Sequence, residues 1–409
     1  MLRSFKLFAP AAALAIAGCN AGGLTVPGTI GQPMSEAHAI PRWQAQNLAH
    51  RACPESRPGE VQCELLILNG SSRIRGSPQG NPYGWGAADI EAAYNLPWSS
   101  KGSGHIVAIV DAYDNPKVGK DLAKYRARYG LPTAKFFKYN QDGEQRHYPK
   151  GDPSWGMEID TDVDMVSASC PNCAIYLVEA NSNDVSDLET AETEAVKLGA
   201  RITSNSFQCG SSFDCGDPNF PSYFDTPGVT YVAAAGDDGY AVSEPMALPS
   251  VVSVGGTVLS RSRATYSEVV WPDTGGGCVV RIAKPSWQHD PGCSGRTAND
   301  VAAVAWNVAI YDTYDEPGWF GIGGTSVAAP IVGGAFALAG NATKQDGGRT
   351  FWTLTKKRLK NDLHVISSGT DNSCPPSLAG SYLCTAGTRQ YKTYSGPTGW
   401  GAPRGIGAF

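Results

Sequence analysis

Short apolar runs alternate with longer amphipathic segments along most of this chain. The runs are nearly continuous, which is typical of strands buried on both faces of a parallel sheet. They occupy residues 105–111, 174–179, 202–206, 229–235 and 251–254. The segments between and after them predict helices at residues 120–129, 158–169, 185–198 and 326–338. Because strands and helices alternate, the pattern predicts an α/β fold with a mostly parallel sheet.

The N-terminal part of the chain has a different pattern. Two basic residues, Arg3 and Lys6, precede an apolar run that ends at Cys19. A run this short, followed by small residues, is typical of a secretory signal. We therefore expect a lipoprotein-type signal peptide over residues 1–18, a short prosegment or extension with a linker over 19–81, and the main domain over 82–409. A lipid on Cys19 is the expected membrane anchor, and an ordinary signal peptide with an incidental cysteine is the alternative.

Composition narrows the classes of partner. The formal net charge is -5, and no cluster of Lys and Arg resembles a surface that binds nucleic acid. No basic amphipathic helix suggests binding to a membrane surface, so any membrane contact is expected through Cys19 alone. The 48 Gly and 28 Pro predict many loops on a folded core. We expect a monomer.

The chain has 11 cysteines, and ten of them remain when Cys19 is set aside. These ten fall into neighbouring pairs, which predicts five local disulfides and an exported protein in an oxidising compartment. The pairs are Cys53 with Cys63, Cys170 with Cys173, Cys209 with Cys215, Cys278 with Cys293, and Cys374 with Cys384. Zinc binding by Cys170 and Cys173 is an alternative, but no second ligand pair accompanies them.

Ser326 is the candidate nucleophile. It follows Gly323 and Gly324 at the start of a predicted helix, where the backbone can approach a substrate closely and the helix favours negative charge. Its backbone N–H can point toward an oxyanion, and Pro330 falls near the first turn. A simple Gly-Thr-Ser helix cap without chemistry is the alternative.

A serine nucleophile needs a base, and carboxylates are the available candidates. None of the six histidines lies in a catalytic motif, so a Ser-His-Asp triad is disfavoured. Acidic residues recur at every second position of the helix predicted over 158–169: Glu158, Asp160, Asp162 and Asp164. Residues four apart share a helix face, so two acidic pairs should face different ways. Like charges held close raise a pKa and share a proton.

Two further aspartates follow predicted strands. Asp237 and Asp111 each lie at a carboxyl end of a strand, which is where sites form in parallel sheets. We interpret Asp111 as a structural carboxylate or one at the edge of a site, since the residues after it do not match a triad aspartate.

Three motifs in order resemble the sedolisins, the serine-carboxyl peptidases with a subtilisin-like fold. The tail over residues 396–401 and the Cys170 to Cys173 turn resemble a secreted bacterial subgroup. The resemblance covers about residues 82–409 and implies a three-layer fold with helices flanking the sheet. The motifs are Glu158-Ile159-Asp160-Thr161-Asp162, Ala235-Gly236-Asp237-Asp238-Gly239, and Gly324-Thr325-Ser326 with Pro330.

The resemblance implies a role for each matching residue in cleaving polypeptides at acid pH. Ser326 attacks the scissile carbonyl, and Glu158 takes the proton and returns it to the leaving amine. Asp162 hydrogen-bonds Glu158 and orients it. A protonated Asp237 and the Ser326 N–H donate to the oxyanion. The rival functions are a catalytically silent surface-binding protein on the same fold and a subtilisin-like hydrolase that uses a histidine.

The chain departs from the family pattern in two places. The calcium site near the C-terminus should have aspartates where Val365 and Ser395 stand, so calcium is doubtful and no metal ligand is predicted. A weaker site built from Asp362, Asp371 and backbone carbonyls is the alternative. The residues between Cys19 and the main domain are also too few for the large prodomain of the family.

Overall fold

The structure is a computed structural model that describes residues 44, 46–70, 84–210, 213, 215–314 and 318–409. These residues belong to one of two units of the chain, residues 38–409. The predicted signal peptide and Cys19 lie outside the described residues. No helix in the described part is long and apolar enough to cross a bilayer.

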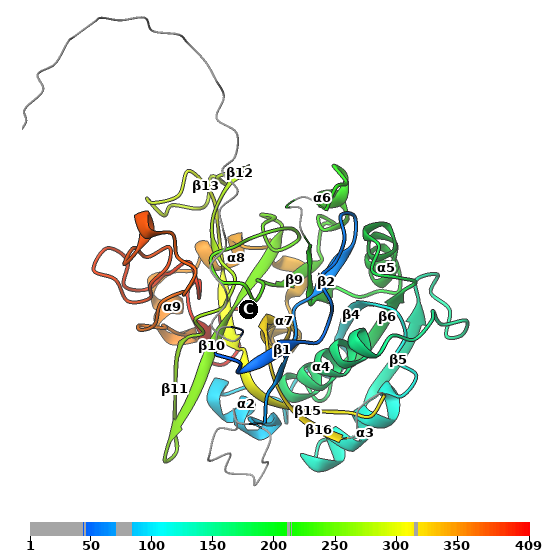
Figure 1. Cartoon of the computed structure of the whole chain (residues 1–409). Helices are drawn as coiled ribbons and strands as arrows, with labels where there is room; N and C mark the ends of the chain where they lie inside the picture. The colour runs from blue at the N-terminus through cyan, green and yellow to red at the C-terminus, as the bar shows by residue number, and fades with distance from the viewer. Residues whose placement is uncertain (1–43, 45, 71–83, 211–212, 214, 315–317) are drawn as a thin grey trace, which may run out of the picture. The chain divides into compact units, whose positions relative to one another are not determined.

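The buried runs form an eight-stranded sheet with the order β11-β10-β9-β7-β4-β6-β5, and β14 pairs with β10. Every pairing in it is parallel except that of β10 with β11. The prediction of a mostly parallel sheet is therefore confirmed (Figure 1). The strands are β4 Ile106–Ala112, β5 Lys135–Asn140, β6 Ala174–Ala180, β7 Ile202–Asn205, β9 Thr230–Ala234, β10 Val251–Ser262, β11 Thr265–Val270 and β14 Val301–Val304.

Helices cover both faces of this sheet. On one face, α7 packs near Ile202 and Ser204 of β7, and α4 packs on α7 and β4. On the other face, Glu192 of α5 interacts with Thr203 and Asn205, the alternate positions of the same strand. The helices are α2 Ala87–Tyr94, α3 Val118–Arg128, α4 Pro153–Ser169, α5 Val185–Lys197, α6 Phe220–Tyr223, α7 Thr325–Ala339, α8 Arg349–Trp352 and α9 Lys356–Asp362, with 3-10 turns at Ala342–Lys344 and Pro376–Leu378.

Smaller sheets tie the N-terminal extension to the domain. One has the order β1-β3-β16-β15, and another pairs β2 with β8. Residues 49–68 thus add strands to the main domain, although the sequence placed them in a separate extension. The remaining strands are β1 Ala49–Arg51, β2 Val61–Cys63, β3 Leu66–Leu68, β8 Phe207–Cys209, β12 Gly277–Ala283, β13 Gly295–Ala298, β15 Trp306–Asp312, β16 Gly318–Gly323, β17 Leu363–His364 and β18 Ala402–Pro403.

All five predicted neighbour disulfides are present. The zinc alternative for Cys170 and Cys173 is wrong, because these two thiols are bonded to each other. One detail of α7 also differs from the prediction. Pro330 lies inside the helix rather than in its first turn, so no N–H is available there for the carbonyl of Ser326.

Candidate active site

Ser326 lies at the start of α7 and is fully buried. The helix begins after Gly324, whose φ of 118° is a conformation that residues with a side chain rarely adopt. The Ser326 hydroxyl donates a hydrogen bond to the carbonyl oxygen of Ser206 at 3.4 Å. The first-turn N–H groups of α7 give this position a positive field. Ser326 therefore lies at the start of a helix, as the sequence predicts.

Glu158 and Asp162 lie on the face of α4 that is turned toward Ser326. Both are fully buried. Burial first, and then the charges of Asp162 and Asp111, raise the pKa of Glu158 well above its usual range. An interaction with the Ser326 hydroxyl lowers the pKa of Glu158, so the two side chains lie within interaction range. Neither carboxyl oxygen of Glu158 has a partner of ordinary hydrogen-bond geometry. This side of α4 therefore presents a base candidate to the serine.

Asp162 interacts with more groups than the sequence suggests. Its Oδ1 accepts a hydrogen bond from the Ser206 hydroxyl at 2.8 Å, and its charge acts on Glu158. Burial and the charge of Asp111 raise the pKa of Asp162 well above its usual range. Asp111 is itself fully buried, and burial raises its pKa to about 8. Three carboxyl groups thus share this space and cannot all be ionised together.

Asp237 lies on the other side of Ser326, just after β9. Its Oδ1 accepts hydrogen bonds from the Thr325 N–H at 2.8 Å and the Thr325 hydroxyl at 3.0 Å. Burial, opposed by these bonds and by Arg51, raises the pKa of Asp237 to about 7. A β-carbon built at Gly324 would lie 2.7 Å from Oδ2 of Asp237. This carboxyl oxygen is therefore next to the glycine at the start of α7. A carboxyl that is neutral in acid therefore lies where it can act as a donor.

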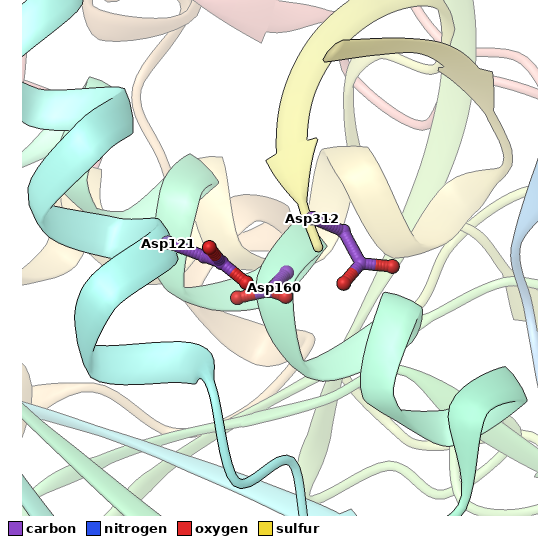
Figure 2. Close-up of side chains that lie close together, drawn as sticks. All are labelled: Asp121, Asp160 and Asp312. Carbon is purple, nitrogen blue, oxygen red and sulfur yellow. The ribbon is translucent and has the colours of Figure 1, made fainter. Parts of the chain in front are cut away.

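The other face of α4 holds a second acidic cluster. Figure 2 shows Asp121 of α3, Asp160 of α4 and Asp312 at the end of β15 close together, and all three are buried. Burial and the charges of Asp312 and Asp164 raise the pKa of Asp160 well above its usual range. The prediction that the acids of this helix face two ways is thus observed. Of the four acids of α4, Glu158 interacts with Ser326, and Asp162 acts on Glu158.

The five histidines in the described part of the chain lie elsewhere. His50 and His289 are exposed, and His50 pairs with Asn69. His105 is beside Gly340, at the far end of α7 and roughly 20 Å along the helix from Ser326. His147 pairs with Glu144 at the surface. His364 lies in β17. This arrangement leaves Ser326 with carboxyl neighbours rather than an imidazole.

Comparison with known proteins decides the family. The model of the subtilase family matches residues 156–401, a span that contains Glu158, Asp162, Asp237 and Ser326. This chain belongs to the subtilase family.

Its relatives place the chain in the sedolisin group of that family. Kumamolisin from Bacillus sp. (strain MN-32) is 30% identical over 286 residues, which is 61% of this chain and 51% of the relative. Sedolisin from Pseudomonas sp. (strain 101) is 23% identical over 402 residues, 86% of this chain and 63% of the relative. This subtilase therefore spans less than two thirds of the length of either relative.

A solved structure agrees on the fold. Pseudomonas sedolisin, described as a serine-carboxyl proteinase complexed with two molecules of pseudo-iodotyrostatin, superimposes with a TM-score of 0.65 and 22% identity. The match covers 80% of this chain and 96% of that one. The predicted subtilisin-like fold and sedolisin family are both confirmed.

The residues near the C-terminus do not fit the calcium site that the resemblance implies. Val365 offers no carboxylate, and the hydroxyl of Ser395 is paired with the Thr398 hydroxyl at 2.8 Å. One oxygen of Asp371 accepts a hydrogen bond from the Ser373 N–H at 2.8 Å, and the other oxygen is buried. Within the described residues, the one group of three acids with metal-ligand spacing is the cluster of Figure 2.

Sequence reasoning missed several residues around Ser326. Ser206 contacts both Asp162 and Ser326, and a polar residue at the carboxyl end of a predicted strand was a usable signal for it. Glu64 is more surprising, because it comes from the N-terminal extension. Its carbonyl oxygen accepts a hydrogen bond from the Ser326 N–H at 3.2 Å. No local sequence pattern connects Glu64 or its ion-pair partner Arg51 to residues more than 140 positions away.

Proposed function

We propose that this subtilase is an exported serine-type endopeptidase that cleaves polypeptides through Ser326, Glu158, Asp162 and Asp237, with highest activity in acid. The observation that carries the proposal is the position of Ser326, buried at a helix start, within interaction range of a carboxyl whose pKa is raised. The five disulfides support export to an oxidising compartment.

The proposed chemistry follows from the protonation of these groups. Ser326 Oγ forms a bond to the substrate carbonyl carbon, and its proton passes to Glu158. The C–N bond then breaks as Glu158 returns that proton to the leaving amine. Glu158 shares its space with two other carboxyl groups, Asp162 and Asp111, and a protonated neighbour can stabilise Glu158 when it is ionised and acts as the base. Water then releases the acyl group by the reverse sequence of proton transfers.

Asp237 explains the expected preference for acid. Below its pKa of about 7 the side chain is neutral and can donate a hydrogen bond to the developing oxyanion. Above that pH it loses the proton and places a negative charge beside the oxyanion. The donor contribution is therefore present in acid and lost as the pH rises through about 7.

A peptide-library digest across acid to mildly basic pH tests the proposal. Ser326→Ala and Glu158→Gln should each lower kcat/KM by roughly 1,000-fold or more, since both remove a group that acts on the reacting atoms. Asp160→Asn is the matched control, because Asp160 lies on the opposite face of α4. Full activity in both catalytic variants would exclude this mechanism. Activity that fails below about pH 6.5 would instead favour a histidine-dependent hydrolase.

A further inference from the structure

The segment that brings Glu64 to Ser326 is held as an added strand. β2 pairs antiparallel with β8, with Val61 opposite Cys209 and Cys63 opposite Phe207. The Asn183 side chain donates to the Val61 carbonyl at 3.0 Å, and the Val61 N–H donates to the Asn183 carbonyl at 2.8 Å. Strand addition of this kind is a common way for a protein to bind an extended peptide.

The backbone of Glu64 continues this pairing into the site. Its N–H donates to the Ser206 carbonyl at 3.1 Å, and its carbonyl accepts from the Ser326 N–H at 3.2 Å. A side chain built at Gly324 would meet the same carbonyl oxygen at 2.3 Å and Asp237 Oδ2 at 2.7 Å. The Glu64 carbonyl oxygen and Asp237 Oδ2 therefore both lie at the start of α7, where the proposed mechanism needs its oxyanion donors. The Glu64 carbonyl thus accepts from the same N–H that the proposed mechanism assigns to the oxyanion.

Both sides of the Glu64–Leu65 bond are tied down separately. On the N-terminal side, Cys63 is bonded to Cys53. On the C-terminal side, Leu66 and Ile67 of β3 pair with both β1 and β16. The Ala52 N–H donates to the Leu65 carbonyl at 3.0 Å, which joins the two sides next to the bond itself. If the bond were cut, the N-terminal fragment would contain both cysteines and would be held to the rest of the chain by the β1–β3 and β2–β8 pairings.

The side chains of the segment are buried as in a bound ligand. Glu64, Leu65 and Leu66 are fully inaccessible to solvent. Arg51 of β1 lies 3.9 Å from a Glu64 oxygen and 2.5 Å from Asp238, the neighbour of Asp237. The segment therefore contacts the site with both backbone and charge. Figure 1 shows β1 and β2, in blue, in front of α7.

We propose that residues 49–68 form a disulfide-braced inhibitory loop that binds the catalytic site in the manner of a substrate, with the Glu64–Leu65 bond at Ser326. This inference rests on the proposed peptidase function. Attack by Ser326 forms the ester to Glu64 and breaks the C–N bond, with the Ser326 proton passing through Glu158 to the Leu65 nitrogen. Because β1 and β16 hold Leu65 in place, its amine can attack the ester and re-form the peptide bond. The loop therefore keeps the enzyme latent.

Displacing the loop should raise activity on added peptides. Glu64→Pro removes the N–H that donates to Ser206 and the side chain that pairs with Arg51. We expect kcat/KM to rise by about tenfold or more, as the fraction of chains with a vacant site increases. Glu55→Pro is the matched control, because Glu55 is exposed on the same loop. If both the wild type and Glu64→Pro cleave peptides and do so with equal kcat/KM, the inference is wrong.

A second measurement does not depend on catalysis. In the Ser326→Ala background the backbone N–H remains, so amides of residues 61–66 and 207–209 should be protected from hydrogen exchange. Glu64→Pro should remove this protection. If these amides exchange freely in Ser326→Ala without Glu64→Pro, the loop does not bind at the site. The amides could instead be protected in a protein that cleaves no peptide, even with Glu64→Pro. That result would reject the peptidase function but would still support binding of the loop at the site.

The brace itself can be tested with the disulfide. Both cysteines lie on the N-terminal side of the bond, so the disulfide restrains Glu64 next to β1 and does not join the two sides covalently. In Cys53→Ser/Cys63→Ser the new Glu64 end is less restrained, so the peptide bond should re-form less often. Intact mass should then show faster loss of the segment that ends at Glu64. Adding Ser326→Ala should abolish this cleavage. Cys278→Ser/Cys293→Ser is the control for disulfide loss elsewhere. Loss of the segment at the same rate in wild type and in Cys53→Ser/Cys63→Ser would contradict the role of the brace.

Discussion

Burial sets the protonation of the carboxyl groups around Ser326. Asp237 is surrounded by backbone and hydroxyl donors from Thr325, yet burial still raises its pKa to about 7. The desolvation of a charge therefore outweighs two hydrogen bonds to it. In the proposed mechanism this balance keeps the Asp237 carboxyl neutral in acid.

Asp237→Asn tests this balance directly. The amide remains a neutral donor at every pH, so the loss of activity expected above about pH 7 should disappear in the variant. The measurement is kcat/KM as a function of pH. Asp225→Asn, at an exposed position, should keep the wild-type profile. An alkaline limb that is unchanged in Asp237→Asn would show that another group controls it.

At the scale of elements, α4 places acids on two opposite faces. Glu158 and Asp162 face Ser326, whereas Asp160 and Asp164 face α3 and β15. Arg126 is the cation that acts on Asp164, whereas no cation acts strongly on Asp160. A buried acid whose folded pKa is raised binds its proton more tightly in the folded state. It therefore stabilises the fold below its unfolded pKa, and this contribution is lost as the pH rises.

Asp160→Asn should stabilise the protein at neutral pH. At about pH 7 the wild type must bury a charge or take up a proton, whereas the amide needs neither and can still accept from Asn115. The Tm measured in EDTA should rise by about 1 to 3 °C at pH 7 and change little near pH 4. If calcium raises the Tm of the wild type but not of the variant, the cluster of Figure 2 is instead a cation site.

Helix α7 depends on a glycine at its start. Gly324→Ala would force a β-carbon into a left-handed conformation and against backbone and Asp237, at a cost of about 1–3 kcal/mol for the strain alone. Activity should fall by roughly 100-fold, since Ser326 follows two residues later. Gly333→Ala in the same helix meets only side chains at ordinary contact distance, so activity should persist. Equal loss in both variants would argue against a local effect.

At the scale of the whole molecule, one buried ion pair joins distant parts of the chain. Arg296 and Asp300 lie 2.5 Å apart and are both fully buried. Asp300 also accepts from the Ser253 N–H of β10 at 3.0 Å and from Trp352 of α8 at 3.3 Å. The pair therefore connects the central sheet to the C-terminal region.

Arg296→Met should destabilise the protein by about 3–5 kcal/mol, because it leaves Asp300 buried and uncompensated. The double variant Arg296→Met/Asp300→Asn should recover part of this loss. The exposed pair of Arg349 and Asp346 gives the control, where Arg349→Met should cost less than about 1 kcal/mol. Urea denaturation measures all three. A loss in the double variant larger than in the single would contradict this explanation.

Local patterns in the sequence are enough to predict the elements and the main candidates for chemistry. Continuous apolar runs such as residues 106–112 predict buried strands, because a parallel sheet buries both faces of each strand. The spacing of Glu158 and Asp162 predicts a shared helix face from the period of the helix alone. Cysteines that are close in the chain predict local disulfides. Each of these properties depends on neighbours within a few positions.

Which of these groups lie in contact depends on long-range packing. Ser206 and Asp111 reach the acids of α4 because β7 and β4 are adjacent strands, and strand order is not encoded locally. Glu64 reaches Ser326 across more than 250 residues through β2 and β8. Such contacts depend on the packing of the complete core, where burial also sets the protonation of each carboxyl. Local sequence patterns therefore predict the helices, the strands and the candidate residues, whereas long-range packing determines which of these residues form the site.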